Sequence, residues 1–168
     1  MINLLLFLTL SLSSKDYSEH ILIGDSQTYY LSKYSTLFKK EKTLCKSGIG
    51  IDFLISGLQN KSTNPKVKSV ILLIGTNDGF VFSKIKSEKL IRLIRKVYPN
   101  SAIYFIKGSW GWGNNKNINE NTVESYSNKM KNLGCEIISQ PIGFGDPHKL
   151  KKEYKLIAEE IKNKINKE

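Results

Sequence analysis

Short apolar runs rich in isoleucine, leucine and valine alternate with helix-like stretches five times along this chain of 168 residues. Near-continuous apolar strands separated by helices require a parallel sheet with helices covering both of its faces. The sequence therefore predicts an α/β fold: a single three-layer α/β/α domain around a five-stranded parallel sheet. The strands are expected at residues 20–24, 43–46, 69–78, 101–108 and 135–139.

The stretches between these runs carry apolar residues three and four positions apart, which is typical of amphipathic helices. Helices are predicted at residues 27–40, after Gly50, at 84–97, at about 119–133 and at the end of the chain. The second helix is expected to bury Ile51, Leu54, Ile55 and Leu58. The third is expected to bury Ile85, Leu90, Ile91, Ile94 and Val97. The last is expected to bury Leu150, Tyr154, Ile157, Ala158, Ile161 and Ile165.

The formal net charge of +11 raises the question of a nucleic-acid partner. Of the 26 cationic residues only Arg92 and Arg95 are arginines, the residue type that reads guanine edges and clamps phosphates. The lysines are also scattered along the whole chain. The sequence therefore favours a solvated, lysine-rich surface and no specific nucleic-acid partner, while loose attraction to anionic polymers stays open.

The N-terminal stretch MINLLLFLTLSLSS is apolar from Ile2 to Leu12 and then turns to small residues. This is the length of a signal-peptide core and too short to span a bilayer. The first cation is Lys15, so the usual charge before the core is missing, and the alternative is an extra strand or helix of the fold. We predict a signal peptide at 1–14, a folded domain at 15–168 and a secreted or cell-envelope protein. Without the signal, the chain is expected in the cytoplasm. No transmembrane segment is expected elsewhere.

Each predicted strand is followed by glycines and polar residues. In an open parallel sheet, ligands bind beyond the carboxyl ends of the strands. The segments at those ends are GDS (24–26), SGIG (47–50), GTND (75–78), GSWGWGNN (108–115) and GFGDPHK (143–149). A purely structural protein needs turns there, but not a serine, an asparagine, an aspartate and a histidine together. The cysteines and histidines, by contrast, show no metal-ligand spacing.

These side chains are the components of acyl transfer. Ser26 can attack a carbonyl if His148 takes its proton, and a carboxylate such as Asp146 can orient the imidazole. Backbone N–H groups of Ser26 and of a glycine, together with the Asn77 amide, can stabilise the oxyanion. The alternatives are structural: a helix cap for Ser26, a turn cap for Asn77 and a surface position for His148.

The order of these segments resembles the four blocks of the SGNH (GDSL-type) hydrolase superfamily over about residues 19–165. The matching blocks are GDSQ after the first strand, Gly48 after the second, GTND after the third and DPH near the end. The resemblance implies a flavodoxin-like sheet and ester hydrolysis without a metal or organic cofactor. It also implies Ser26 as nucleophile and Asn77 as an oxyanion donor. For the glycine donor it favours Gly48 over Gly50, because of the apolar helix positions that follow.

The last block departs from the usual Asp-x-x-His spacing, because this chain has Asp146-Pro147-His148, one residue shorter. Proline favours an extended conformation at the residue before it, and in an extended stretch residues i and i+2 project to the same side. We therefore expect a triad of Ser26, His148 and Asp146. The alternative is a dyad of Ser26 and His148 in which a backbone carbonyl orients the imidazole.

The flavodoxin-like strand order also bears on the two cysteines. It places the strands of Cys45 and Cys135 at opposite edges of the sheet, roughly 19 Å apart. Bridged Cα atoms lie within about 7 Å of each other, so no disulfide between them is expected.

Trp110 and Trp112 alternate with glycines in the loop after the fourth strand. We expect them to contact substrate, by stacking on sugar rings or by lining an acyl pocket. The alternative is that one indole folds over the core as a lid. The predicted function is a serine esterase acting on a small-molecule or carbohydrate ester, including O-acetyl groups. The alternative is a weakly active or inactive binding protein for carbohydrate or an anionic polymer.

Overall fold

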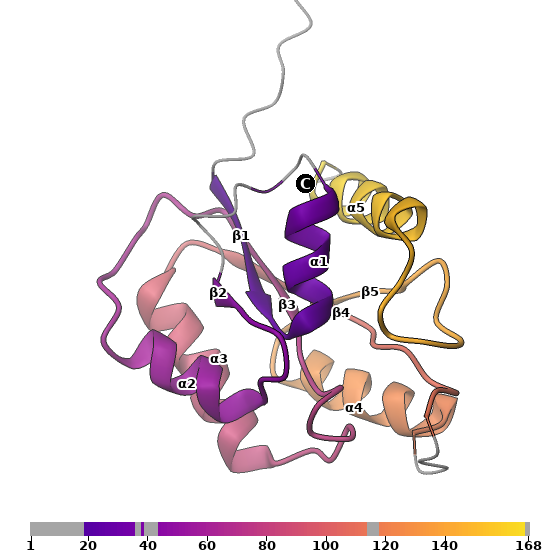
Figure 1. The fold of residues 1–168 in the computed structure, drawn as a ribbon. Coiled ribbons are helices and arrows are strands. Elements are labelled where there is room, and N and C mark those ends of the chain that lie inside the picture. Colours follow the sequence, from indigo (N-terminus) through magenta and orange to yellow (C-terminus); the bar gives the residue numbers. More distant parts are fainter. Residues whose placement is uncertain (1–18, 36–37, 39–43, 114–117, 167–168) are drawn as a thin grey trace, which may run out of the picture.

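The computed structural model describes residues 19–35, 38, 44–113 and 118–166, with a sheet at the centre (Figure 1). Its strands are β1 (His20–Gly24), β2 (Leu44–Cys45), β3 (Ser69–Leu73), β4 (Ala102–Ile106) and β5 (Glu136–Ile138). Its helices are α1 (Ser26–Tyr34), α2 (Ile51–Gln59), α3 (Lys84–Val97), α4 (Glu120–Asn132) and α5 (Lys151–Ile165). Strands and helices alternate along the chain, as predicted.

The sheet has the strand order β2-β1-β3-β4-β5, and every neighbouring pair is parallel. This confirms the flavodoxin-like order. The chain runs from β1 to β2 on one side and then crosses to β3 on the other. The carboxyl ends of β1 and β3 are therefore neighbours, with Gly24 in register with Leu73. Ligands of open parallel sheets bind at such a switch in winding direction.

Successive residues of each strand enter cores on opposite faces of the sheet. One core joins α2, α3 and α4 to strand residues such as Ile23, Leu72 and Phe105. The other joins α1 and α5 to strand residues such as Leu22 and Tyr104. Figure 1 shows α2 and α3 together on one side of the sheet and α1 with α5 on the other. The predicted three-layer α/β/α architecture is confirmed.

The predicted first helix is longer than the observed one. Helix α1 ends at Tyr34, and Ser35 has an extended backbone while its N–H still donates to Leu31 O. Serine competes for backbone hydrogen bonds and favours helix ends over helix interiors. The rest of the predicted helix, apart from Phe38, lies outside the described residues.

Two apolar residues that were expected in the core face solvent. Ile85 is 79% exposed, because the buried face of α3 runs through Ser87, Leu90 and Ile94, and Ile85 precedes Ser87 by two residues, more than half a turn. Leu150 is 62% exposed because it is the N-cap of α5 and lies before the helix itself, whose first buried residue is Tyr154. The remaining residues of both predicted stripes are buried.

The two cysteines lie at opposite edges of the sheet. Cys45 ends β2, Cys135 directly precedes β5, and no disulfide joins these two described residues, which confirms the prediction. Within the described part of the chain, none of the helices has both the length and the apolar character needed to span a membrane. The predicted signal peptide lies outside the described residues and stays a prediction.

Candidate active site

The junction between β1 and α1 holds Ser26 at the carboxyl edge of the sheet. A Cβ atom at Gly24 would overlap the Leu73 carbonyl of β3, and this close approach lets the Asp25 N–H donate to Leu73 O at 3.1 Å. The Asp25 carboxylate then caps α1 by accepting from the Gln27 N–H at 2.9 Å. Ser26 is thereby the first residue of the helix and 4% exposed. The helix N-terminus favours negative charge at this position.

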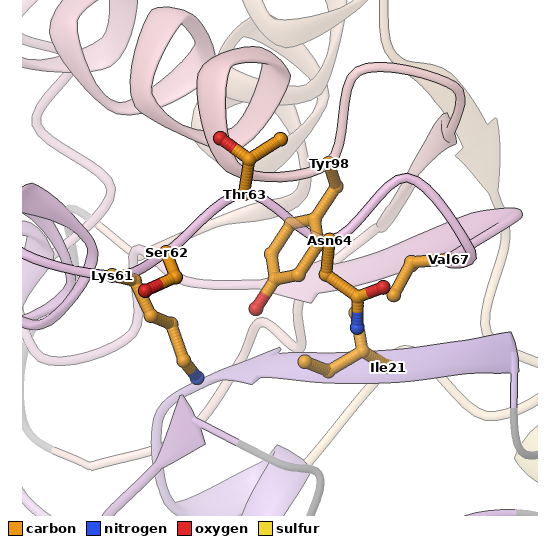
Figure 2. Close-up of a pocket in the computed structure, with 7 residues that line it drawn as sticks. All are labelled: Ile21, Lys61, Ser62, Thr63, Asn64, Val67 and Tyr98. Atoms are coloured by element: carbon orange, nitrogen blue, oxygen red, sulfur yellow. The ribbon is translucent and has the colours of Figure 1, made fainter.

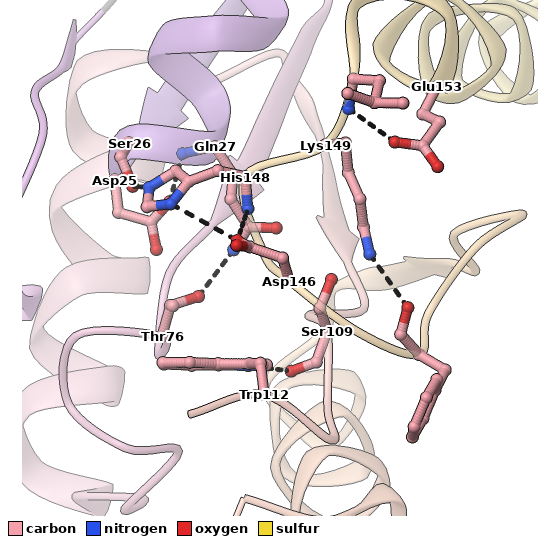
Figure 3. A network of polar contacts seen from close by, with 12 residues as sticks. Asp25, Ser26, Gln27, Thr76, Ser109, Trp112, Asp146, His148, Lys149 and Glu153 are labelled. Carbon is pink, nitrogen blue, oxygen red and sulfur yellow. Dashed lines mark hydrogen bonds and ion pairs between the residues drawn. The ribbon is translucent and has the colours of Figure 1, made fainter. Parts of the chain in front are cut away.

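The structure brings Ser26 and His148 together although 122 positions separate them in the sequence. Ser26 Oγ lies 2.9 Å from His148 Nε2, which is hydrogen-bond distance (Figure 3). His148 lies in the loop between β5 and α5. The ring of Tyr30 meets the imidazole edge-on, with centroids 5.7 Å apart. A serine hydroxyl paired with an imidazole nitrogen is the geometry of an activated nucleophile.

Asp146 lies beside His148, but the two side chains are slightly too far apart for a hydrogen bond. Oδ1 of Asp146 is 3.6 Å from Nδ1 of His148. The same Oδ1 accepts a hydrogen bond from the backbone N–H of His148 at 2.7 Å, which closes a tight turn around Pro147. Both side chains project to the same side of the loop, as Figure 3 shows. The structure thus places the carboxylate next to the imidazole.

Lys149 fastens the loop that carries His148. Its side chain is 8% exposed, and Nζ donates to Phe144 O at 3.3 Å. Burial lowers the pKa of Lys149, which the nearby carboxylates of Glu153 and Asp146 oppose. The loop is therefore held by contacts on both sides of the histidine.

Asn77 and Asp78 both contact the loop between β2 and α2. Asn77 Nδ2 donates to Ile49 O at 2.8 Å, and Asp78 Oδ2 accepts from the Ile51 N–H at 3.1 Å. Asp78 thereby caps α2, whose own N-cap Gly50 has no side chain to do so. An amide nitrogen carries two protons, so the contact with Ile49 O uses only one of the two Nδ2 protons of Asn77.

The two candidate glycines of this loop differ in their surroundings. A Cβ atom at Gly50 would overlap the Asp78 carboxylate, so Gly50 is required for packing. Gly48 has a φ of 73° and no atom within 4 Å of where its Cβ would lie. Gly48 as the oxyanion donor in place of Gly50 stays a prediction.

The two tryptophans both make structural contacts. The backbone of Trp110 pairs with the loop before His148: its N–H donates to Gly143 O at 3.0 Å, and its carbonyl accepts from Gly145 at 2.8 Å. Trp112 Nε1 donates to Ser109 O at 3.0 Å. Both half-buried indoles pack against the core that contains α4. Trp110 therefore fastens the β4 loop to the histidine loop, and contact of either indole with substrate stays a prediction.

Asp25 is a fully buried carboxyl group next to Ser26. Its side chain has no exposed surface, and Oδ2 has no hydrogen-bond partner among the described residues. Burial raises the pKa of Asp25 to about 7, and the hydrogen bond from the Gln27 N–H and the nearby Thr76 side chain act in the opposite direction. The neighbouring Asp78 carboxylate adds to the rise. Asp25 thus retains its proton to a much higher pH than an ordinary aspartate.

Two further residues next to the pair were not predicted from the sequence. Tyr30 contacts His148, and the buried side chain of Gln27 donates to Thr76 Oγ1 at 2.7 Å. For both residues, the four-residue spacing typical of a helix indicates their position. Tyr30 lies four residues after Ser26 and so shares its face of α1, while Gln27 lies four residues before the apolar Leu31.

A cavity of about 520 Å³ lies at the opposite end of the sheet (Figure 2). It is lined by Ile21, Lys61, Ser62, Thr63, Asn64, Val67 and Tyr98. Ile21 belongs to the amino-terminal half of β1 and Val67 precedes β3, whereas Ser26 follows the carboxyl end of β1. The cavity is therefore separate from the Ser26 site. In the described ranges no group of three or more His, Cys, Asp or Glu side chains could hold a metal ion.

Several solved structures share this fold at low sequence identity. A GDSL-like lipase from Bacteroides thetaiotaomicron has a TM-score of 0.64 and 12% identity over 88% of this chain and 87% of that chain. A lipolytic protein of the G-D-S-L family from Veillonella parvula has a TM-score of 0.57 and 12% identity over 86% of this chain and 96% of that chain.

A third solved structure with this fold is the C-terminal catalytic domain of peptidoglycan O-acetyltransferase A from Streptococcus pneumoniae, determined with a methylsulfonyl adduct. It has a TM-score of 0.59 and 15% identity over 89% of this chain and 93% of that chain. No protein-family model matches the sequence, and no curated protein matches it either. The three structures confirm the predicted fold, which this chain shares with them.

Proposed function

We propose that this chain is a serine-dependent ester hydrolase in which Ser26 is the nucleophile and His148 the general base. The observation that carries this proposal is the 2.9 Å contact between Ser26 Oγ and His148 Nε2 at the carboxyl edge of the sheet. Such edges are the ligand-binding edges of open parallel sheets. That the solved structures with the same fold include lipases and an O-acetyltransferase supports acyl chemistry.

In the first half of the reaction, Ser26 Oγ attacks the ester carbonyl while His148 Nε2 takes the hydroxyl proton. The tetrahedral intermediate then collapses, and the protonated imidazole gives this proton to the leaving alcohol. An acyl group remains on Ser26. In the second half, His148 activates a water molecule in the same way, and the acid is released as the Ser26 hydroxyl is restored.

In this proposal, three donors stabilise the negative charge that develops on the substrate oxygen. They are the backbone N–H groups of Ser26 and Gly48 and the second Nδ2 proton of Asn77. The N-terminal position of Ser26 on α1 adds the favourable end of the helix dipole. One such donor typically stabilises the transition state by roughly 3 kcal/mol.

Asp146 orients the imidazole in this proposal. Oδ1 of Asp146 lies 3.6 Å from Nδ1 of His148, and such contacts in ligand-free enzymes commonly shorten when substrate binds. A carboxylate at Nδ1 favours the tautomer that leaves Nε2 free to accept the proton of Ser26.

For the substrate we propose small acyl esters, and O-acetyl groups on carbohydrate in particular. Trp110 and Trp112 are each only half-buried, and indole faces stack on sugar rings. One of the solved structures with this fold is named as a peptidoglycan O-acetyltransferase, which supports an O-acetyl substrate.

The proposal is tested by measuring turnover of p-nitrophenyl acetate and of a panel of acetylated sugars. Wild type should hydrolyse at least one of them, and Ser26→Ala should abolish this activity. Ser32→Ala is the matched control, because Ser32 is a buried serine on the same helix whose hydroxyl donates to Tyr29 O at 2.7 Å. Equal turnover by wild type and Ser26→Ala would refute the proposal.

A further inference from the structure

Gln27 has a side chain that the proposed mechanism does not use, although it is the residue next to the nucleophile. It is 2% exposed. Its Nε2 donates to Thr76 Oγ1 at 2.7 Å, and its Oε1 accepts from Gln140 Nε2 at 3.5 Å. One amide on α1 therefore contacts the loop after β3 through Thr76 (Figure 3) and the loop after β5 through Gln140.

Apolar packing alone does not require an amide at this buried position. Gln27 is on the side of α1 that also carries the buried Leu31, where an apolar side chain would add to the core. Burying an amide removes its hydration, so the position is favourable only if its hydrogen bonds are formed. The short contact to Thr76 is the bond that meets this requirement.

Thr76 transmits the position of Gln27 to Asn77. Thr76 and Asn77 are consecutive residues of one turn. Two backbone hydrogen bonds close this turn: Asp78 N–H and Phe80 N–H both donate to Gly75 O, at 3.1 and 2.8 Å. A turn closed in this way moves as a unit. Fixing the Thr76 hydroxyl against α1 therefore fixes the Asn77 amide relative to the helix that begins with Ser26.

We infer that Gln27 is a positioning residue, which holds the Asn77-bearing turn against the helix of the nucleophile through its hydrogen bond to Thr76. The inference rests on the proposed function, because Asn77 matters only if an oxyanion forms. Oxyanion donors act only within a narrow range of positions, and small displacements of such groups cost as much as 100-fold in rate.

The test is a set of steady-state measurements with p-nitrophenyl acetate, together with thermal denaturation of each variant. Gln27→Leu should lower kcat by about tenfold or more and change KM less than about twofold, because the Asn77 amide that Gln27 positions acts only in the transition state. Thr76→Val should behave in the same way, whereas Thr76→Ser keeps the hydroxyl and should stay within about threefold of wild type.

The deciding variant combines Gln27→Leu with Asn77→Ala. If Gln27 acts through Asn77, its substitution should lower kcat by less than about twofold once Asn77 is absent. An equal loss in both backgrounds would overturn the inference, because Gln27 would then act independently of Asn77. Unchanged kcat in Gln27→Leu would overturn it as well. If Gln27→Leu does not fold, Thr76→Val in the two backgrounds gives the same comparison.

Two controls separate this inference from neighbouring explanations. Ser127→Ala removes another buried side-chain hydrogen bond, to Val123 O on α4 at 2.8 Å, and should lower the melting temperature without lowering kcat. Ser26→Ala reports on the proposed function alone. Activity lost in Ser26→Ala but unaffected in Gln27→Leu would leave the function standing and refute only the role of Gln27.

Discussion

A single oxygen of Asp146, Oδ1, contacts His148 at two of its atoms. Oδ1 accepts from the backbone N–H of His148 at 2.7 Å and lies 3.6 Å from Nδ1 of the same residue. The first contact shapes the loop, and the second is the candidate catalytic one. Because a carbonyl oxygen can replace Oδ1 in the first contact, an asparagine at this position removes the charge while it keeps the turn.

We therefore expect Asp146→Asn to fold normally and to lower kcat by about 10- to 100-fold. This is less than the roughly 10⁴-fold loss at buried orienting carboxylates, because the Asp146 and His148 side chains are 74% and 53% exposed and water screens their interaction. Asp146→Ala should lose more, since the turn is lost as well. Comparing kcat for wild type, Asp146→Asn and Asp146→Ala checks this. A kcat of Asp146→Asn within threefold of wild type would contradict the triad and leave a dyad of Ser26 and His148.

The sequence predicts the role of a single residue when that role follows from the residue's own place after a strand or in a helix. Ser26, Asn77 and His148 were identified because each follows a strand, and the carboxyl ends of parallel strands meet at one edge. The role of Gln27 could not be derived in this way. Its partner Thr76 lies 49 positions away, and the contact exists only because β3 lies next to β1 in the sheet.

At the scale of elements, the junction of β1 and α1 depends on the absence of a side chain at Gly24. A methyl group there would overlap the backbone carbonyl of Leu73, which cannot move without shifting β3. Gly24→Ala should therefore lower the free energy of unfolding by about 3 kcal/mol or more. Gly79→Ala is the control: its φ is 60° but the space around it is open, so about 1 kcal/mol of backbone strain is expected. Urea denaturation measures the free energy of unfolding of both variants. Equal losses of this free energy would contradict the close contact between Gly24 and the Leu73 carbonyl.

The boundaries of the elements were less predictable than their order. Periodicity located all five helices, but it assigned Ile85 and Leu150 to the buried stripes. Both residues lie within a residue or two of a helix start, where a single position decides whether a side chain faces the sheet or the solvent. Apolar content alone does not contain this information, because exposed apolar residues are common at surfaces.

At the scale of the whole molecule, Asp25 links stability to pH. Its pKa is about 7 in the folded protein against 3.8 for an ordinary aspartate, chiefly because of burial. Between these values the unfolded chain has released the proton and the folded protein retains it. Folding then requires proton uptake, so the free energy of unfolding falls as pH rises from about 4 to about 7 and this contribution is constant above that range.

Asp25→Asn should remove this dependence while it preserves the helix cap, because asparagine is an equally good N-cap. Relative to wild type, the variant should gain up to about 4 kcal/mol of stability between pH 4 and pH 8. Urea denaturation across this range measures the difference. Glu160→Gln, which removes an exposed carboxylate on α5, is the control for the loss of one negative charge and should show no such trend. A difference between wild type and Asp25→Asn that does not vary with pH would contradict a raised pKa.

The pairing of Ser26 with His148 is the central claim, and covalent labelling with a fluorophosphonate tests it most directly. The reagent reacts with a serine whose proton is removed by a neighbouring base. We expect a single adduct by intact mass spectrometry, located by peptide mapping at Ser26, absent in Ser26→Ala and formed at least about 100-fold more slowly in His148→Ala. Labelling at another residue, or labelling of Ser26 at the same rate with and without His148, would contradict the account.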